Sequence, residues 1–406
     1  MASDGSAVSA PAPARLLPGW RQVLPGAAVL LAVAALWQGQ LQTLPDARAL
    51  GLSLLLGLLF GALLQRSRFC FYCVSRDFLE QRDARGLLGV LAALAVGTLG
   101  YHAVFGAFLP DPQGTRLPPG AHIGPVSWVL VAGGASFGLG MALAGSCISA
   151  LWYRLGEGAL AAPFALGGAL LGFGLGFLSW NTLYLHALQE APTPWLPQQL
   201  GYAGSLALQL GVLAVLALAL ARWHRPPAPA AGEQAWWQRR WPTHVGGVLI
   251  GALATAAYLR VAPLGVTADL GSWARTGADA AGLLPARLEG LDVLRGCATV
   301  VKASLWSNNG VFVLGLVAGA GACALLAGDF RPRRPTAAEI GRHLLGGVLM
   351  GWGAMVALGC TVGTLLSGIM AAAVSGWLFA ASCGAGLVLG WWLRRRLGGK
   401  LHAVSA

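Results

Sequence analysis

Charged side chains are scarce in this 406-residue sequence, where Asp, Glu, Lys and Arg together make up only 10%. With 56% hydrophobic residues and a mean hydropathy of +0.65, this scarcity excludes an ordinary soluble globular protein. Acidic residues are the rarer kind, 15 against 27 basic ones, which gives a net charge of +12. The arginines form short clusters between apolar runs and no continuous basic face, so we expect membrane-protein loops and no nucleic-acid partner.

Signatures of disulfides, metals and signal peptides are also missing. The seven cysteines are odd in number and lack the spacing of a secreted disulfide framework, so we expect free thiols. His102, His122 and His186 show no metal-ligand spacing, and neither a metal nor a cofactor is expected. The tail 1–22 is rich in Ala, Pro and Ser and is expected to be disordered. No cleavage site precedes Gly39, which argues against a removed signal peptide.

Ten apolar runs, several shorter than a full span, predict an all-α polytopic membrane protein of nine or ten helices with short or re-entrant segments. They occupy residues 23–37, 49–65, 86–109, 125–150, 159–180, 201–221, 245–263, 309–327, 343–360 and 371–393. A linker rich in Pro and Arg, residues 222–244, separates a first membrane half, 23–221, from a second half, 245–406.

Positive charge is unevenly distributed between these runs. Arginines cluster in loops 66–85, 222–244 and 328–342 and near the C-terminus, whereas 181–200 and 361–370 contain no Lys or Arg. The bias places the arginine clusters and both termini in the cytoplasm. Loop 264–308 is placed outside despite its four basic residues, because long loops cross membranes regardless of charge.

A glycine frame precedes three of the cysteines. Each cysteine lies thirteen and nine residues after two glycines, in the sets Gly57, Gly61, Cys70; Gly134, Gly138, Cys147; and Gly347, Gly351, Cys360. A fourth copy, Gly315 and Gly319, has Gly328 in place of the cysteine. The recurrence predicts an internal repeat and two pseudo-symmetric halves. The Cys147 and Cys360 segments run in opposite directions, as an inverted repeat requires, but the Cys70 and Gly328 segments come out parallel, so the handedness stays open.

Thiols at such positions suit a soft anion that crosses the bilayer. Backbone N–H groups at helix starts supply partial positive charge, and glycine lets a ligand approach them. A neutral thiol adds a weak donor and a polarizable sulfur, which holds a sulfur-bearing anion loosely enough to release it. The candidate binding residues are Cys70, Cys147, Cys360, Gly145, Ser146, Gly359 and Thr361.

The remaining cysteines are interpreted differently. Cys297, Cys323 and Cys383 are expected to be small buried hydrophobic residues. Cys70 and Cys73 form a CxxC pair, which is compatible with redox chemistry, but one copy offers no metal tetrad. We therefore expect Cys73 to be incidental.

Three blocks of this sequence resemble the YeeE/YedE family of sulfur transport membrane proteins. They are GLLFGALLQRSRFCFYCVSRDFL (57–79), GGASFGLGMALAGSCISALWYRLGEG (133–158) and GGVLMGWGAMVALGCTVGTLLSGI (346–369), with a fainter block at 306–326. The resemblance implies a carrier in the bacterial inner membrane that brings thiosulfate, or a related sulfur or selenium species, into the cytoplasm. It also implies a possible soluble sulfur-carrier partner similar to TusA, and it assigns the characteristic cysteines to Cys70, Cys147 and Cys360.

The middle block departs from the family pattern. Gly145-Ser146-Cys147-Ile148-Ser149 replaces the usual GGC or GAGC and Gly-Thr-like pair. Candidates for a gate or mouth are Arg68, Arg76 beside Asp77, Arg154 and Glu157; ordinary inside charge, or a local ion pair fixing the 154–157 loop, explains them equally well.

Two other functions remain open from the residues alone. One is a membrane thiol oxidoreductase that uses Cys70 and Cys73 and requires an electron acceptor. The other is a variant in which a cysteine thiolate takes up sulfane sulfur as a persulfide, contrary to the neutral-thiol argument.

Overall fold

The computed structural model of this chain describes residues 20–114, 116–225, 238–285, 287–291, 294 and 306–403. Most of the predicted tail 1–22, the centre of the linker 222–244, and Cys297 therefore lie outside the described residues. Within them the backbone is helical, and β-type pairing is confined to isolated bridges such as Ala159 with Arg333. The predicted all-α class is confirmed.

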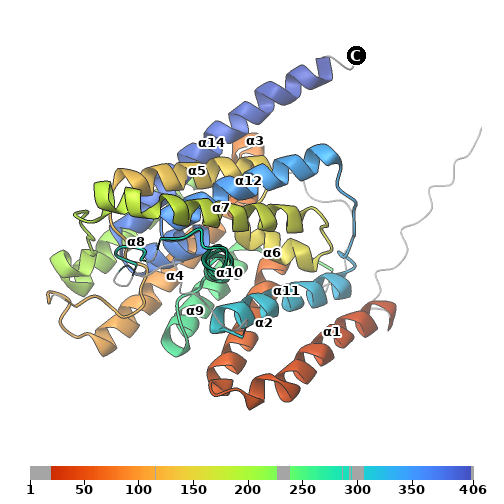
Figure 1. Cartoon of the computed structure of the whole chain (residues 1–406), viewed down its shortest axis with the longest axis horizontal. Helices are drawn as coiled ribbons and strands as arrows, with labels where there is room; N and C mark the ends of the chain where they lie inside the picture. Colours follow the sequence, from red (N-terminus) through yellow and green to blue (C-terminus); the bar gives the residue numbers. More distant parts are fainter. Residues whose placement is uncertain are drawn as a thin grey trace, which may run out of the picture.

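Each of the ten apolar runs coincides with a long helix (Figure 1). These helices are α1 (Trp20–Gly39), α2 (Ala47–Ser67), α4 (Arg85–Phe108), α5 (Trp128–Ala144), α7 (Ala162–Leu183), α8 (Leu196–Trp223), α9 (Thr243–Arg260), α11 (Asn308–Ala327), α12 (Ala337–Val356) and α14 (Val374–Ala403). Shorter helices, which the apolar pattern does not separate, are η1 (Leu41–Thr43), α3 (Phe71–Gln81), α6 (Ile148–Gly156), η2 (Tyr184–Leu188), α10 (Ala268–Ala280), η3 (Thr361–Ser367) and α13 (Gly368–Met370).

In the described part of the chain, eight helical segments are long and apolar enough to cross a membrane. A ninth is the pair formed by α12 and residues 361–370, which is bent by 46° at a short break. Helix α9 is not among these candidates; its ends carry the polar residues Thr243, His244 and Arg260. With the bent pair included there are nine candidate spans in the described residues, which agrees with the lower of the predicted numbers, nine or ten.

Four closely packed parallel helix pairs join the first half of the chain to the second. Close backbone contacts show that α2 pairs with α11, α4 with α9, α5 with α14 and α7 with α12. Contact positions rise together along both members, as where Gly57 lies against Phe312 and Gly61 against Leu316, so each pair is parallel. The glycine frame is therefore a packing device: a Cβ at either glycine would collide with the backbone of α11, and glycine allows the close approach that membrane helices use.

Helices α5 and α12 pack against each other in the opposite sense. Gly133 of α5 lies against Val356 and Ala357, whereas Ala144 lies against Gly346. The sequence predicts these opposite directions for the Cys147 and Cys360 segments, and it also predicts the parallel course of α2 and α11. An overall pseudo-symmetry of the two halves stays a prediction.

The arginine-bearing loops meet on one face of the bundle. The amide of Arg225 donates to the carbonyl of Arg82 at 3.0 Å, and the amide of Trp241 donates to that of Arg66 at 3.0 Å. The amide of Arg331 donates to the carbonyl of Glu157 at 3.2 Å. Loops far apart in sequence thus share one side, as a common cytoplasmic location of these clusters requires.

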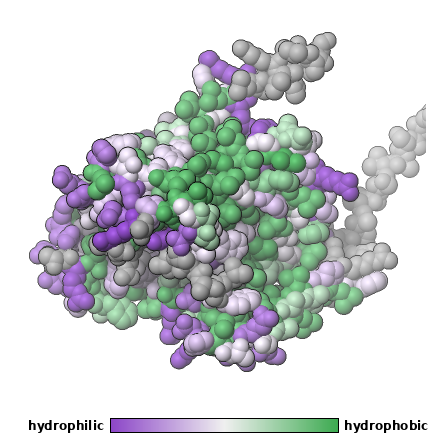
Figure 2. Space-filling view, viewed as in Figure 1, coloured by the Kyte–Doolittle hydropathy of each residue, from purple (hydrophilic) through white to green (hydrophobic). Residues whose placement is uncertain are grey.

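The outer surface of the bundle is apolar over a wide area. Figure 2 shows hydrophobic residues across the centre and upper part of this face, with hydrophilic residues gathered at its edges. Large apolar side chains of α7 and α8, such as Leu171, Leu178, Val215 and Leu218, are exposed. Such a surface is expected where lipid tails surround the protein.

Candidate functional site

Each of the three frame cysteines begins a short helix that continues a long one. Cys70 is the N-cap of α3, Cys147 the N-cap of α6 and Cys360 the N-cap of η3, and all three side chains are fully buried. The preceding long helices are α2, α5 and α12, which carry the glycine frames. The repeat found in the sequence therefore corresponds to a repeated helix break with a cysteine at the break.

The break contains a left-handed residue at the same position in all three copies. The residue two positions before each cysteine is left-handed: φ is 50° at Arg68, 69° at Gly145 and 56° at Leu358. Glycine adopts this conformation freely, whereas Arg68 and Leu358 are strained there. In the fourth copy Gly328 itself is left-handed and ends α11.

Cys70 and Cys147 form a close pair of thiols. Their sulfur atoms lie 3.8 Å apart in the protein interior. The hydroxyl of Ser149 lies 3.1 Å from the sulfur of Cys147, and the amide of Cys73 donates to the sulfur of Cys70 at 3.5 Å. Two helix starts from the first half of the chain thus converge on one polarizable, weakly polar spot.

Arg154 of α6 contacts a residue close in sequence to each of these two cysteines. Its guanidinium donates to the sulfur of Cys73 at 3.1 Å and to the carbonyl of Gly145 at 3.3 Å. Cys73 thus lies between Cys70 and a cation, and the expectation that it is incidental to function stays a prediction. The i, i+3 spacing of Cys70 and Cys73 at a helix start was the available signal, because such a spacing places both side chains on one face.

Cys360 lies elsewhere in the bundle. Because α5 and α12 are antiparallel, Cys147 and Cys360 follow opposite ends of that pair, and the twelve residues from Gly133 to Ala144 span about 17 Å of helix. Beside Cys360, the buried hydroxyl of Thr361 has no hydrogen-bond partner. An unpartnered buried hydroxyl is costly, so it marks a place where a polar ligand would be stabilised.

The other two candidate binding residues, Ser146 and Gly359, shape the breaks. Ser146 is fully buried and its hydroxyl lies 3.4 Å from the carbonyl of Cys147. A side chain at Gly359 would collide with the hydroxyl of Thr364, so the backbone before Cys360 approaches η3 closely.

The expected gate residues have separate partners. Arg68 is exposed, and Arg76 forms an ion pair with Asp77 at 2.7 Å. Glu157 accepts a hydrogen bond from Gln65 at 3.3 Å, and Gln65 also donates to Asp329 at 3.2 Å. Burial raises the pKa of Glu157. Arg154 and Glu157 thus belong to two neighbouring clusters, one around the thiols and one joining three loops of the arginine-rich face.

Other cysteines and histidines fill packing positions. Cys383 is buried against Gly138 of α5, and Cys323 lies half-buried on α11, as expected for small hydrophobic residues. The ring of His102 is hydrogen-bonded to the carbonyl of Thr98 and the hydroxyl of Ser205. Across the described ranges, no cluster of three His, Cys, Asp or Glu residues is arranged to hold a metal ion.

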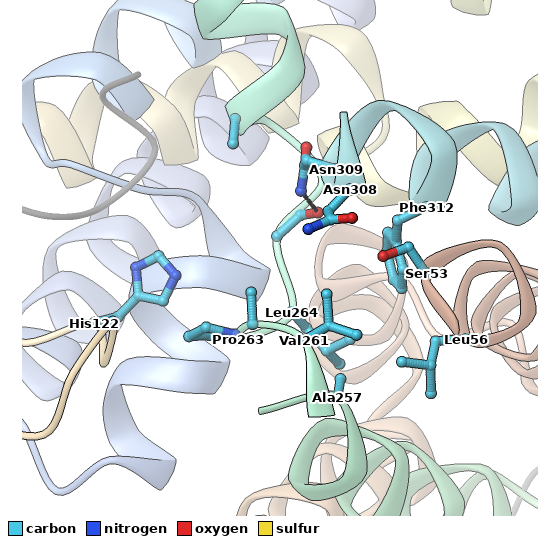
Figure 3. Close-up of a pocket in the computed structure, with 14 residues that line it drawn as sticks. Ser53, Leu56, His122, Ala257, Val261, Pro263, Leu264, Asn308, Asn309 and Phe312 are labelled. Carbon is cyan, nitrogen blue, oxygen red and sulfur yellow. Dashed lines mark hydrogen bonds between the residues drawn. The ribbon is translucent and has the colours of Figure 1, made fainter. Parts of the chain in front are cut away.

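A cavity of about 300 Å³ opens at the ends of α9 and α11 away from the arginine-rich face (Figure 3). Its lining comes from α2, from the loop before α5, from α9 and the loop after it, and from the starts of α10 and α11. The loop 264–267 links this cavity to the short helices that follow Cys147 and Cys360. The indole of Trp152 in α6 donates to the carbonyl of Val266 at 3.0 Å, and the hydroxyl of Ser367 in η3 donates to the carbonyl of Leu264 at 3.4 Å.

Broken, glycine-packed membrane helices with buried polar groups at the breaks define a multi-pass membrane transport protein. Residues 66–389 match the family described as "Sulphur transport", and the chain belongs to this family. The YeeE/YedE resemblance is confirmed, and the family consists of transporters rather than enzymes.

Two relatives are similar over most of their length. The thiosulfate transporter TsuA of Spirochaeta thermophila is 30% identical over 348 residues, which covers 80% of this chain and 93% of the relative. The thiosulfate transporter TsuA of Escherichia coli K12 is 28% identical over 347 residues, which covers 80% of this chain and 88% of the relative.

Proposed function

We propose that this protein imports thiosulfate, or a similar soft sulfur-containing anion, across the bacterial inner membrane into the cytoplasm. The family supports transport of a sulfur compound, and the names of both relatives favour thiosulfate. The observation that carries the proposal is the buried pair of thiols, Cys70 and Cys147, at the starts of two short helices.

The chemistry of the pair suits transient binding. Neutral thiols are weak donors and polarizable acceptors, so they interact with a sulfane sulfur without the strong attraction of a fully exposed cation. Arg154 supplies one positive charge close by, but its guanidinium is engaged by Cys73 and Gly145. A dianion is therefore stabilised near the break and is still able to leave.

The proposed route uses the cysteines in order of their positions along the bundle. Cys360 and Thr361 lie at the end of α12 remote from its arginine-rich start, and Cys70 and Cys147 lie toward the arginine-rich face. With that face in the cytoplasm, the anion meets Cys360 first and then the thiol pair. Gly145, Ser146 and Gly359 shape the breaks, and Arg68, Arg76, Arg154 and Glu157 lie at or near the exit.

Growth tests this function directly. In a strain without other importers, the wild-type protein should support growth on thiosulfate as sole sulfur source, and Cys147→Ala or Cys360→Ala should abolish it. Cys323→Ala is the matched control, because Cys323 is a half-buried cysteine on α11 outside the three breaks. Normal growth with both site variants would reject the role of the thiols.

The cytoplasmic orientation and the partner are separate parts of the proposal. A reporter that is active only in the cytoplasm should be active when it is fused to either terminus. A soluble TusA-like sulfur carrier would receive the sulfur on the arginine-rich face. Co-purification with and without thiosulfate tests that part, and mass spectrometry of Cys70, Cys147 and Cys360 after substrate exposure distinguishes non-covalent passage from a persulfide mechanism.

A further inference from the structure

The cavity at the start of α11 has one unusual polar group, Ser53. This residue lies in the apolar helix α2 and is only 2% exposed, yet its hydroxyl has no hydrogen-bond partner. A serine in a membrane helix ordinarily donates to a carbonyl one turn earlier, as Ser67 of the same helix does to Leu63. Figure 3 shows the oxygen of Ser53 directed from α2 toward the cavity.

The start of α11 faces the same cavity. Ser307 caps this 20-residue helix by accepting from the amide of Gly310 at 3.0 Å. Asn308 and Asn309 line the cavity, and Asn309 donates to the carbonyl of Gly265 at 2.7 Å. The side chain of Asn308 is exposed there, at the partly positive end of the helix.

The remaining walls are apolar or neutral. Leu56, Val261, Pro263 and Phe312 supply hydrocarbon surface, and His122 lies on the opposite side from Ser53 (Figure 3). Burial lowers the pKa of His122 to about 4, so its ring is uncharged at neutral pH. The cavity thus combines neutral hydrogen-bond donors with polarizable apolar surface.

We infer that this cavity is an entrance subsite, which binds the oxygen-bearing end of a thiosulfate-like anion before the anion reaches the thiols. The inference rests on the proposed transport function. The hydroxyl of Ser53 and the amide of Asn308 donate to the sulfonate oxygens, and Leu56 and Phe312 accommodate the terminal sulfur.

The position of the subsite supports this order. The loop Leu264–Thr267 lines the cavity with Leu264 and Gly265, and on its other side it is bound to α6 and η3, the helices that begin after Cys147 and Cys360. Asp269, just beyond this loop, accepts from the hydroxyl of Ser307 at 3.1 Å. Its carboxylate repels an anion, which keeps binding weak enough for onward movement.

Uptake kinetics of labelled thiosulfate in reconstituted vesicles test the subsite. Removing one donor to a charged ligand should raise KM about 10-fold in Ser53→Ala, with the maximal rate within about 2-fold of wild type. Asn308→Asp should raise KM at least as much, because it adds a negative charge. Ser53→Thr keeps the hydroxyl and should restore a wild-type KM. Ser136→Ala is the matched control, since that serine of α5 already donates to Leu349 at 3.0 Å.

Equilibrium binding separates this inference from the proposed function. Purified Cys147→Ala protein should bind labelled thiosulfate although it does not transport it, and adding Ser53→Ala should weaken that binding about 10-fold. Equal binding by the single and double variants, or an unchanged KM in both Ser53→Ala and Asn308→Asp, would overturn the subsite. Failure of the wild-type protein to take up thiosulfate would instead overturn the proposed function.

Discussion

The sulfur atoms of Cys70 and Cys147 lie 3.8 Å apart although the two residues are 77 positions apart in sequence. The contact exists because α2 and α5 both end in a left-handed residue, and each break turns its cysteine into the interior. It places two thiols from separate breaks at one point of the proposed route.

This proximity predicts an efficient cross-link. A disulfide requires the two sulfurs to approach to about 2.05 Å, a shift of less than about 2 Å that side-chain rotation and small helix movements can supply. Diamide, a two-electron thiol oxidant, should therefore join Cys70 to Cys147, with loss of both thiol protons, and stop thiosulfate uptake until dithiothreitol reduces the bond.

Peptide mass spectrometry identifies the bond that forms. The Cys70–Cys147 peptide should dominate over a Cys70–Cys73 product, because the sulfurs of Cys70 and Cys147 are already 3.8 Å apart and the sulfur of Cys73 is held by Arg154. Cys147→Ser should take up no thiosulfate either before or after diamide treatment, and it should show no Cys70–Cys147 cross-link. Predominant Cys70–Cys73 oxidation would contradict the geometry.

Replacing glycine by alanine should reduce stability only where the glycine closely contacts a neighbouring helix. In Gly61→Ala the new methyl group collides with the backbone of Leu316, so the protein should lose about 1–3 kcal/mol of stability. Gly174→Ala of α7 has no neighbouring atom within 4 Å and should leave the melting temperature unchanged. Thermal unfolding in detergent compares the two, and equal melting temperatures would show that α2 and α11 are not packed so closely.

Arg154 is predicted to hold the thiol pair in position through two directed hydrogen bonds. Lysine keeps the charge but cannot reach both Cys73 and Gly145 with one planar fork. Arg154→Lys should therefore lower the uptake rate about 10-fold and reduce the yield of the Cys70–Cys147 cross-link. If charge alone matters, lysine will preserve both.

His122 predicts how stability responds to acid. Its pKa falls from an ordinary value of about 6.5 to about 4 in the folded protein, so the neutral ring is favoured by folding. The stability it contributes is fully present above about pH 6.5 and is lost as the pH falls toward 4, by up to about 3 kcal/mol. Melting temperatures from pH 7 to 4.5 should decline less steeply in His122→Asn, and identical slopes would contradict the assignment.

Helix positions and the shared arginine face followed from the sequence because both have simple causes. Long apolar runs must form helices in lipid, and Arg66, Arg82 and Arg331 lie at run ends that loops can bring together. The glycine frame also located the three cysteines that begin helices. In each copy the two glycines lie where the long helix closely contacts a neighbouring helix, and the cysteine lies at the break that follows.

Tertiary contacts within the site could not be predicted in the same way. The frame predicts that Cys147 and Cys360 are equivalent, but the pairing of Cys147 with Cys70 depends on how α2 and α5 pack. Helices α3 and α6 are short and partly polar, so their apolar pattern resembles that of loops. The left-handed conformations of Arg68 and Leu358 gave no sequence signal, since only glycine or asparagine would have indicated them.

The most direct test of the transport account is accumulation of labelled thiosulfate in sealed vesicles that contain the purified protein. We expect wild-type and Cys323→Ala protein to accumulate thiosulfate in preference to sulfate, and Cys70→Ala and Cys147→Ala to accumulate neither. Undiminished thiosulfate uptake by the correctly folded Cys70→Ala and Cys147→Ala proteins would contradict it.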